Sequence, residues 1–165
     1  MIDFDKVKDF RVLLVGDAIT DEYRYVRVVG KAVKEAALSF LFEKRETFHG
    51  GVWAAAQHVK GFCSRVDTMT GPMVMWNRRH VDTVYLRKLN VEHALRPNSD
   101  EPKDYDIRSY DVVIVTDFGH GTMTKALIER VTREARFLAV NTQTNAPNYG
   151  FNLITKYPRA DFVVL

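Results

Sequence analysis

The segment at residues 111–131 reads "DVVIVTDFGHGTMTKALIERV" and joins a strand-like run, a glycine turn and a helix-like run. Its opening residues are apolar and mostly β-branched, which is typical of a strand buried in a parallel sheet. Residues 122–135 repeat apolar side chains at helical spacing, and Thr122 or Thr124 could cap the first turn. Another strand-like run follows directly at 136–142. This strand–helix–strand order with short connections predicts an α/β fold with a mainly parallel sheet.

Similar patterns predict the other elements of the chain. "FRVLLVG" (10–16) predicts a buried parallel strand, and Gly50 and Gly51 predict a turn before a helix at 53–60. Residues 17–31 are polar and aromatic without helical spacing, so we expect a loop or an edge segment there. The remaining expectations are strands or edge strands at 38–48, 64–71, 78–93 and 160–165, and loops at 96–106 and 143–158.

The composition is that of an ordinary globular domain. The chain has 165 residues, of which 46% are hydrophobic and 27% charged, which is enough for a buried core in a single domain. The net charge of +3 suits anionic small molecules, but the sequence has no dense Lys/Arg run, so nucleic acid is not an expected partner. The polar first residues and the lack of an apolar run of about 20 residues predict neither a signal peptide nor a membrane span.

Two pairs of residues early in the chain are candidate ligand contacts. Asp17 and Asp21 follow the strand at 10–16, and carboxylates at the carboxyl end of a strand can accept hydrogen bonds from sugar hydroxyls. The alternative is a solvated loop. Gly50 and Gly51 precede a helix, where they either form a tight turn or allow a close approach to a ligand.

The loop after the strand of the opening segment is the third candidate. Asp117 ends that strand, and Gly119 and Gly121 can adopt backbone conformations that let the chain approach a ligand closely. The amino end of the following helix would suit a phosphate. The alternative is a tight turn capped by Asp117, and the segment lacks the third glycine of a dinucleotide-binding fingerprint. Asn141 heads a polar run at the end of the next strand.

Other chemistry-bearing residues point to structural roles. The five histidines show no metal-ligand spacing, so no metal site is predicted. Trp53 and Trp76 are expected to pack against the core. The single cysteine, Cys63, is expected to be a small buried hydrophobe and is typical of a protein from a reducing cytoplasm.

Taken together and in this order, several segments resemble the PfkB (ribokinase-like) carbohydrate kinases. The branch that they resemble most is that of the heptose-phosphate kinases of ADP-heptose synthesis. The segments are "VLLVGDAITDEYRY" (12–25), "GKAVKEAALSFLFEKRETFHGGVWAAAQHV" (30–59), "RRHVDTVYLRKLNVE" (78–92), the opening segment at 111–131 and "FLAVNTQTNAPNYGFNLITKYPRADFVVL" (137–165).

The resemblance implies both a fold and a reaction. The fold is a Rossmann-like α/β domain over 1–165, incomplete, with helices on both faces of a mainly parallel sheet. Residues 22–48 and 78–93 would be remnants of a small β lid or edge strands. The reaction is transfer of a phosphoryl group from ATP, with Mg2+, to a sugar or sugar phosphate in the cytoplasm. By resemblance, the sugar contacts would be Asp17, Asp21, Gly50 and Gly51, the reaction centre would adjoin Asp117, Gly119 and Gly121, and Asn141 would lie near the phosphates.

The chain also departs from the family's pattern. Only residues 73–76 stand where the family has a long stretch of strands and helices, and Ala54 stands where the family has a sugar-binding Asn, with Gln57 the nearest amide. The family's Asn-x-x-Glu segment, its Gly-Ala-Gly-Asp anion hole with the general base, and its adenine pocket would lie beyond Leu165. The sequence therefore identifies no catalytic residue and no nucleotide pocket.

Two other functions stay open on these observations. Absent strands would leave a sheet edge open, which favours a non-catalytic module that forms a homo-oligomer or binds a partner chain. An unrelated Rossmann-like domain that holds a phosphorylated ligand at residues 119–122 would also account for the two glycines in that loop.

Overall fold

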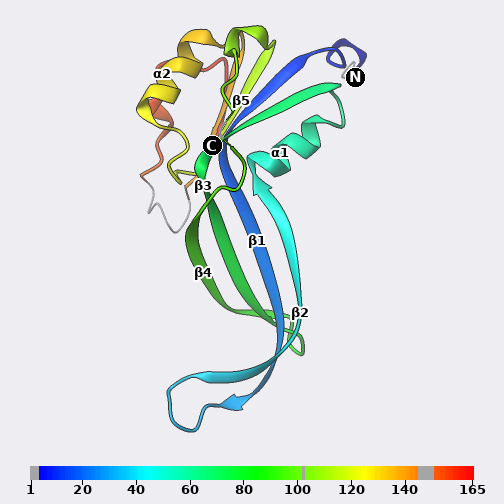
Figure 1. Cartoon of the computed structure of the whole chain (residues 1–165), viewed down its shortest axis with the longest axis vertical. Helices are drawn as coiled ribbons and strands as arrows, with labels where there is room; N and C mark the ends of the chain where they lie inside the picture. The colour runs from blue at the N-terminus through cyan, green and yellow to red at the C-terminus, as the bar shows by residue number, and fades with distance from the viewer. Residues whose placement is uncertain (1–3, 102, 145–150) are drawn as a thin grey trace.

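The computed structural model describes residues 4–101, 103–144 and 151–165. The described chain forms one sheet with the strand order β4-β3-β1-β5-β6-β7, and β2 pairs with β1 outside this path (Figure 1). The strands are β1 (Arg11–Lys31), β2 (Leu38–Gly51), β3 (Arg65–Asp82), β4 (Arg87–Pro97), β5 (Val112–Asp117), β6 (Leu138–Thr142) and β7 (Phe162–Val164). The helices are α1 (Val52–Val59) and α2 (Lys125–Glu134), with 3-10 turns at Phe4–Lys6, Ile107–Ser109 and Ile154–Lys156.

The centre of the sheet is parallel and is covered on both faces. β3, β1, β5, β6 and β7 run parallel to one another, whereas β2 and β4 are antiparallel to their neighbours. Alternate residues of β1 face opposite cores: Leu13 and Val15 pack on the side of α2, and Val12 and Leu14 pack on the side of α1. The predicted α/β fold with helices on both faces of a mainly parallel sheet is confirmed.

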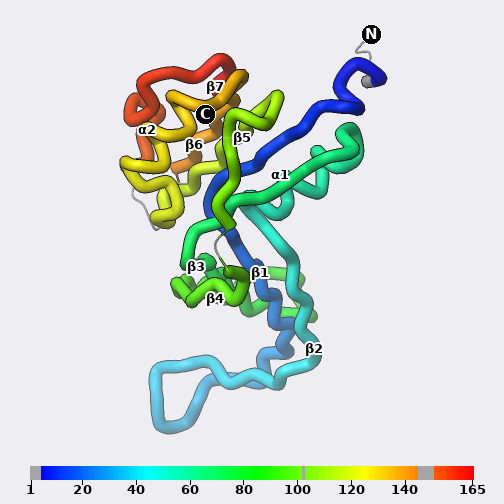
Figure 2. The backbone as a smooth tube through the Cα atoms, turned by 45° about the horizontal axis from the view of Figure 1, so that its top comes forward, coloured from blue at the N-terminus to red at the C-terminus, as the bar shows by residue number. Residues whose placement is uncertain are grey.

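The four strands β1 to β4 continue below the core as a long, curved extension (Figures 1 and 2). Past Ala18, β1 is paired on one side with β2 and on the other with β3, whose own far edge pairs with β4 from Met73 onward. The extension contains residues 22–48, in the β1–β2 hairpin, and residues 78–93, which are divided between the ends of β3 and β4. It leaves the core at the carboxyl ends of the central strands.

The expectation of a loop or edge segment at 17–31 is wrong, because the whole stretch belongs to β1. Its polar side chains do not interrupt the strand, since residues 18–26 pair with β2 on one edge and with β3 on the other. From residue 27 to Lys31 the strand continues paired with β2 alone. For the same reason β3 runs well past the predicted 64–71 and ends at Asp82. The pairing partners that decide both boundaries are far away in the sequence.

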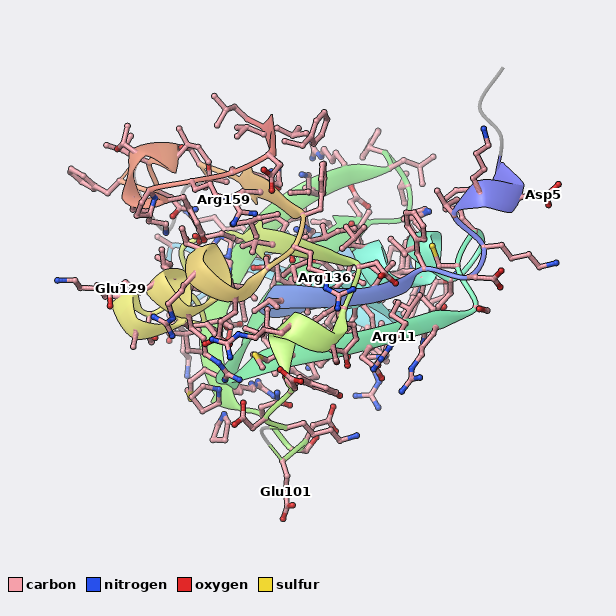
Figure 3. The ribbon with its side chains drawn as sticks, turned by 90° about the horizontal axis from the view of Figure 1, so that it is seen from above. Asp5, Arg11, Glu101, Glu129, Arg136 and Arg159 are labelled. Atoms are coloured by element: carbon pink, nitrogen blue, oxygen red, sulfur yellow. The ribbon has the colours of Figure 1, made fainter. Side chains whose placement is uncertain are left out.

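α2 is capped at both ends, at its start by a threonine that the sequence offered as a cap and at its end by a residue distant in the sequence. Thr124 is the residue before α2, and its hydroxyl accepts a hydrogen bond from the amide of Leu127 (3.3 Å). At the other end of α2, Arg159 donates to the carbonyls of Thr132 and Ala135, both at 3.1 Å (Figure 3). A cation at this end satisfies otherwise unpaired carbonyls, and it fastens α2 to the segment before β7.

Cys63 and the two tryptophans have the structural roles expected of them. Cys63 is 9% exposed, and burial raises the pKa of its thiol. Trp53 and Trp76 pack against the core on the side of α1. No helix in the described ranges is long and apolar enough to cross a membrane.

Gly16 allows β1 and β5 to approach closely at the point where they part. A Cβ atom at this position would lie 2.1 Å from the carbonyl oxygen of Thr116, the residue opposite it on β5. No side chain fits at this distance, so glycine is required for the pairing of the two central strands here.

We predict that Gly16→Ala lowers the free energy of unfolding by about 3 kcal/mol or more, because the new methyl group must push β1 and β5 apart. Gly30→Ala is the matched control. Gly30 has a similar φ, 150° against 158°, but a Cβ there meets no described atom within 4 Å, so the expected loss is about 1 kcal/mol. Urea unfolding measures both, and equal losses would contradict the steric role of Gly16.

Candidate functional site

The candidate site lies at the carboxyl ends of β5 and β6, beside the point where β1 stops pairing with β5. β1 pairs with β5 only as far as Gly16, and from there it enters the extension. β5 ends at Asp117 and continues into residues 118–122, called here the glycine loop, before α2. Ligands of α/β proteins commonly bind in the crevice at such strand ends.

Asp17 is buried beneath the glycine loop and binds it through both carboxylate oxygens. Oδ2 accepts hydrogen bonds from the backbone amides of Phe118 (2.8 Å) and His120 (3.1 Å), and Oδ1 accepts one from Thr122 (3.0 Å). Asp17 is only 1% exposed. Hydrogen bonds to an ionised acceptor are strong, and they offset the cost of burying the carboxylate. In the structure Asp17 therefore positions the glycine loop.

These same bonds occupy the place that the sequence suggested for a phosphate. The amides of His120 and Thr122 donate to Asp17, and the amide of Gly119 donates to Oδ1 of Asp117 (3.0 Å). An anion at the loop would have to compete with two carboxylates of the chain itself. The contact joins residues 105 positions apart, which is why the local sequence pattern did not reveal it.

Gly119 and Gly121 have the unusual dihedral angles that the sequence suggested. Their φ angles are 73° and 100°, in the region that favours glycine. These conformations turn the chain so that alternate amides, those of residues 118, 120 and 122, donate to Asp17. The glycines are required by the loop itself, whether or not a ligand approaches it.

Gly50 and Gly51 lie against Asp17 and Asp21. A Cβ at Gly51, whose φ is 59°, would lie 2.2 Å from the carbonyl oxygen of Asp17. A Cβ at Gly50 would lie 3.2 Å from Oδ2 of Asp21. The expected turn is wrong, because Gly50 and Gly51 are the last residues of β2 and pair with Ile19 and Ala18 of β1. The structure gathers the two glycines and the two acids in one place.

Asp21 lies on the extension in a row of polar side chains that crosses three strands. Its Oδ1 accepts hydrogen bonds from the side-chain amide of Asn77 (2.9 Å) and from Arg79. The amide oxygen of Asn77 in turn contacts Nδ1 of His93 on β4 (2.7 Å). Arg79 also lies over the ring of Tyr23, 5.3 Å from its centroid. The side chain of Asp21 is 25% exposed, so this acid is reachable from solvent.

Asp117 is a second buried acid, 1% exposed, at the end of β5. Its Oδ2 accepts a hydrogen bond from the hydroxyl of Tyr157 (2.5 Å) and lies 2.6 Å from Nζ of Lys156. Lys156 also donates to Oδ1 of Asn152 (2.5 Å), whose amide nitrogen donates to the backbone carbonyl of Asp117 (2.7 Å). The charge of Asp117 is thus matched by one cation and by several donors.

Tyr157 is held in its neutral form by this arrangement. Burial raises the pKa of Tyr157, and the hydrogen bond to Asp117 raises it further. The phenol is 7% exposed and packs in the core on the side of α2. It is a donor to the buried acid rather than a group that would ionise near neutral pH.

A cavity of about 380 Å³ opens beside Asp117. It is lined by the two loop glycines, by Lys156 and by Asn152, with Met123 and Phe151 as its apolar part. The ammonium group of Lys156 is the cationic group of this wall. The cavity has the size of a small-molecule site, and it adjoins the end of β5 where the sequence predicted the reaction centre.

The side chain of Asn141 makes a hydrogen bond within the sheet. Its side-chain amide donates to the backbone carbonyl of Val164 (3.2 Å), so it fastens β6 to β7. In the sheet it stands beside Thr116 of β5. Its predicted place near phosphates stays a prediction.

Sequence reasoning missed two groups of side chains that complete the site. The first group lies in or beside the stretch at 78–93 and comprises Asn77, Arg79 and His93. It was missed because nothing in the local pattern fixes the register of these residues against Asp21. The other group, Asn152, Lys156 and Tyr157, lies in a segment expected to be a loop. The "ITKYP" run at 154–158 held a weak signal, since a Tyr beside a Lys after an apolar turn suits a buried acid.

Comparisons with known proteins give similarity in structure alone. No protein-family model and no curated protein matches the chain. A ribokinase from Thermotoga maritima is similar at a TM-score of 0.48 and 9% identity, with 93% of this chain and 58% of that chain covered. The tetrameric inhibited form of phosphofructokinase-2 from Escherichia coli is similar at a TM-score of 0.47 and 10% identity, with coverages of 81% and 55%.

A ribokinase from Arabidopsis thaliana, in complex with ribose and ATP, is similar at a TM-score of 0.45 and 10% identity, with 83% of this chain and 55% of that chain covered. The chain therefore spans a little more than half the length of these three proteins. At these identities and scores the similarity does not decide an activity.

We predict that Asp17→Asn lowers the free energy of unfolding by about 2–4 kcal/mol, because an amide side chain has one acceptor oxygen for three backbone donors. Hydrogen exchange should also show faster exchange at the amides of residues 118, 120 and 122. Glu129→Gln, at an exposed position of α2, is the control. Unchanged protection of the three amides would contradict the positioning role.

We predict that Tyr157 makes the fold sensitive to alkaline pH. Because its pKa is raised in the folded state, its stabilising contribution is complete below the unfolded pKa of about 10 and declines as the pH rises above it. Tyr157→Phe should therefore flatten the decline by about 1.4 kcal/mol per pH unit above pH 10. Urea midpoints between pH 9 and 11 measure the slopes, and parallel slopes for the two proteins would rule the effect out.

Proposed function

We propose that this chain is a ribokinase-like (PfkB) carbohydrate kinase by descent and that its described part is the sugar-binding side of the site. One observation carries the proposal: three motifs far apart in the sequence meet at the carboxyl ends of the parallel strands. Asp17 contacts the glycine loop, and Gly50 and Gly51 pack on Asp17 and Asp21. The order of these motifs in the sequence is the order that resembles the family.

In this proposal Asp21 is the acid that accepts a hydrogen bond from the sugar. Its Oδ1 is held by Asn77 and Arg79, while Oδ2 faces Gly50 and has no hydrogen-bond donor among the described residues. A glycine at position 50 leaves room for a sugar carbon where a side chain would stand. The sugar or sugar phosphate would lie between this acid and the glycine loop.

Asp17 has a supporting role in this arrangement, which differs from the sugar contact that the resemblance implies. Both of its oxygens are engaged by loop amides, and 1% exposure leaves no room for a hydroxyl. It positions the loop that borders the sugar. Asp117 and Lys156 form the far wall, at the cavity beside β5.

The extension would act as the lid of the site. β1 carries both Asp17 in the core and Asp21 on the extension, so the lid and the core are joined by one continuous strand. The residues that hold Asp21 in place come from β3 in the same extension. We therefore assign residues 22–48 and 78–93 to a β lid rather than to a separate domain.

ATP and Mg2+ belong to the reaction that the family resemblance implies. In the part of the chain that the structure describes, no three His, Cys, Asp or Glu side chains converge as ligands of a metal ion. The two acids nearest the glycine loop already hold amides, a lysine and a tyrosine. The described residues do not fit Mg2+, so we assign none of them to the metal, to the nucleotide or to a general base.

A second candidate function is a non-catalytic module that associates through the sheet edge. β7 pairs only with β6 among the described strands, and its Phe162, Val163 and Val164 are 57%, 42% and 47% exposed. An apolar strand with one open edge can pair with another chain, either a second copy or a partner. This function does not require a sugar.

We predict that the protein binds D-ribose or sedoheptulose 7-phosphate and that Asp21→Asn weakens this binding about tenfold, because a neutral amide is a poorer acceptor for a hydroxyl. Isothermal titration calorimetry measures the affinity. Glu46→Gln is the matched control, since Glu46 is a carboxylate of the same extension that binds Lys44 and Tyr25.

Equal affinities for Asp21→Asn and the unchanged protein would contradict the assignment of Asp21. A protein that binds neither probe but is a dimer in light scattering would contradict the sugar-binding proposal and favour the association module.

A further inference from the structure

The upper half of β3 has an edge that no described strand covers. β4 pairs with β3 only from Met73 downward, so residues 65–70 pair with β1 on one side alone. The chain returns past this edge as a loop on its way from β4 to β5, of which the structure describes residues 98–101 and 103–105. Two further hollows lie between this edge and the loop.

The loop is fastened at both ends. At its start, the side-chain amide of Asn98 donates to the hydroxyl of Thr70 and to the carbonyl of Gly71, both at 3.0 Å. At its end, Arg130 of α2 bonds the carboxylate of Asp104 (2.5 Å) and the carbonyl of Tyr105 (2.7 Å). The described residues between these anchors, 99–101 and 103, form a bridge over the open edge rather than a strand paired with it.

Two adjoining hollows lie under and beside this bridge, of about 380 and about 390 Å³. Both are lined by Trp53, Thr68, Ser99 and Asp100. Trp53 of α1 lines both hollows, and neither hollow shares a lining residue with the cavity beside Asp117. The hollows are therefore separate from that cavity.

The lining combines a flat aromatic ring with hydroxyl and carboxylate groups. The indole of Trp53 meets the ring of His49 edge-on, at a centroid distance of 4.9 Å and an angle of 77°. Thr68 and Ser99 offer hydroxyls that donate and accept, and Asp100 offers acceptors. An indole can pack against the C–H face of a sugar ring while such groups bond its hydroxyls.

The charges around the hollows are balanced. Lys60 lines one hollow and Lys103 the other, while Asp100 lines both. Glu101 lines the same hollow as Lys103, so two acids and two lysines offset each other around the hollows. Neither a strongly anionic nor a strongly cationic ligand is favoured by this set of groups.

We propose that these hollows form a second ligand site, which binds a neutral polyhydroxylated molecule of monosaccharide size against Trp53. The volume is in the range of small-molecule sites. Asp100 accepts hydrogen bonds from the ligand, and Thr68 and Ser99 complete the polar contacts. The site does not depend on the proposed kinase-like function, because none of its residues belongs to the Asp21 or Asp117 groups.

The test follows the indole N–H signal of Trp53 by NMR as D-glucose is added. The chain has only two tryptophans, so Trp76→Phe identifies the signal. We expect a saturable shift with a dissociation constant of about 1–10 mM, which Asp100→Asn weakens about fivefold or more. Ser99→Ala should weaken it as well, by about twofold to fivefold.

Two control variants test whether the lost affinity belongs to the hollows beside Trp53. Glu129→Gln removes the same charge from an exposed position of α2 that lines neither hollow, and it should leave the affinity unchanged. Asp21→Asn, which tests the sugar site of the proposed function, should also leave the Trp53 titration unchanged.

Three outcomes would overturn the proposal. The first is no saturable shift of the Trp53 signal up to about 50 mM D-glucose. The second is an equal effect of Asp100→Asn and Glu129→Gln. The third is binding of D-glucose 6-phosphate about tenfold more tightly than D-glucose, which would make the hollows an anion site.

Discussion

The hydrogen bonds between the Asp17 carboxylate and the amides of the glycine loop are the contact on which the site depends. Asp17 stands where β1 leaves the core, and the loop stands where β5 passes into α2. A buried carboxylate must have its oxygens satisfied, so the three amides and the acid constrain one another strongly. The contact thereby joins the base of the extension to the end of the central strand. Gly16, beside it, lets the two strands meet closely enough for the contact to form.

Asp17 and Asp117 show how two acids are buried at adjoining strand ends without metal ligation among the described residues. One is satisfied by backbone amides, and the other by Lys156, Tyr157 and the amide of Gly119. Both solutions engage the carboxylates of the acids themselves, which is why we propose the more exposed Asp21 as the acid that contacts a ligand. By the same reasoning, a phosphate is not expected at the glycine loop, because the loop amides already donate to Asp17 and Asp117. Burial and hydrogen-bond count thus assign different roles to three acids of the same type.

Much of the architecture was predictable, because local patterns decide it. The runs at 10–16 and 111–117 are apolar enough to be buried strands in any packing, and Thr124 lies at a position where its hydroxyl can cap α2. The polar stretch at 17–31 was not predictable as a strand, since its conformation comes from pairing with β2 and β3 on its two edges. Likewise Asn77 and Arg79 meet Asp21 only through the register of β1 against β3, which no local pattern encodes.

The sequence by itself determined the α/β class, the glycines that the loop and the end of β2 require, and the set of acids near the strand ends. These features depend on apolar periodicity and on backbone angles, which act over a few residues. Only the tertiary structure decided which acid is buried, which is exposed and which donors each one holds. Those outcomes depend on contacts between residues as far apart in the sequence as Asp17 and Thr122. An unsatisfied buried charge is costly, and only the folded chain brings the donors that satisfy it to the carboxylate.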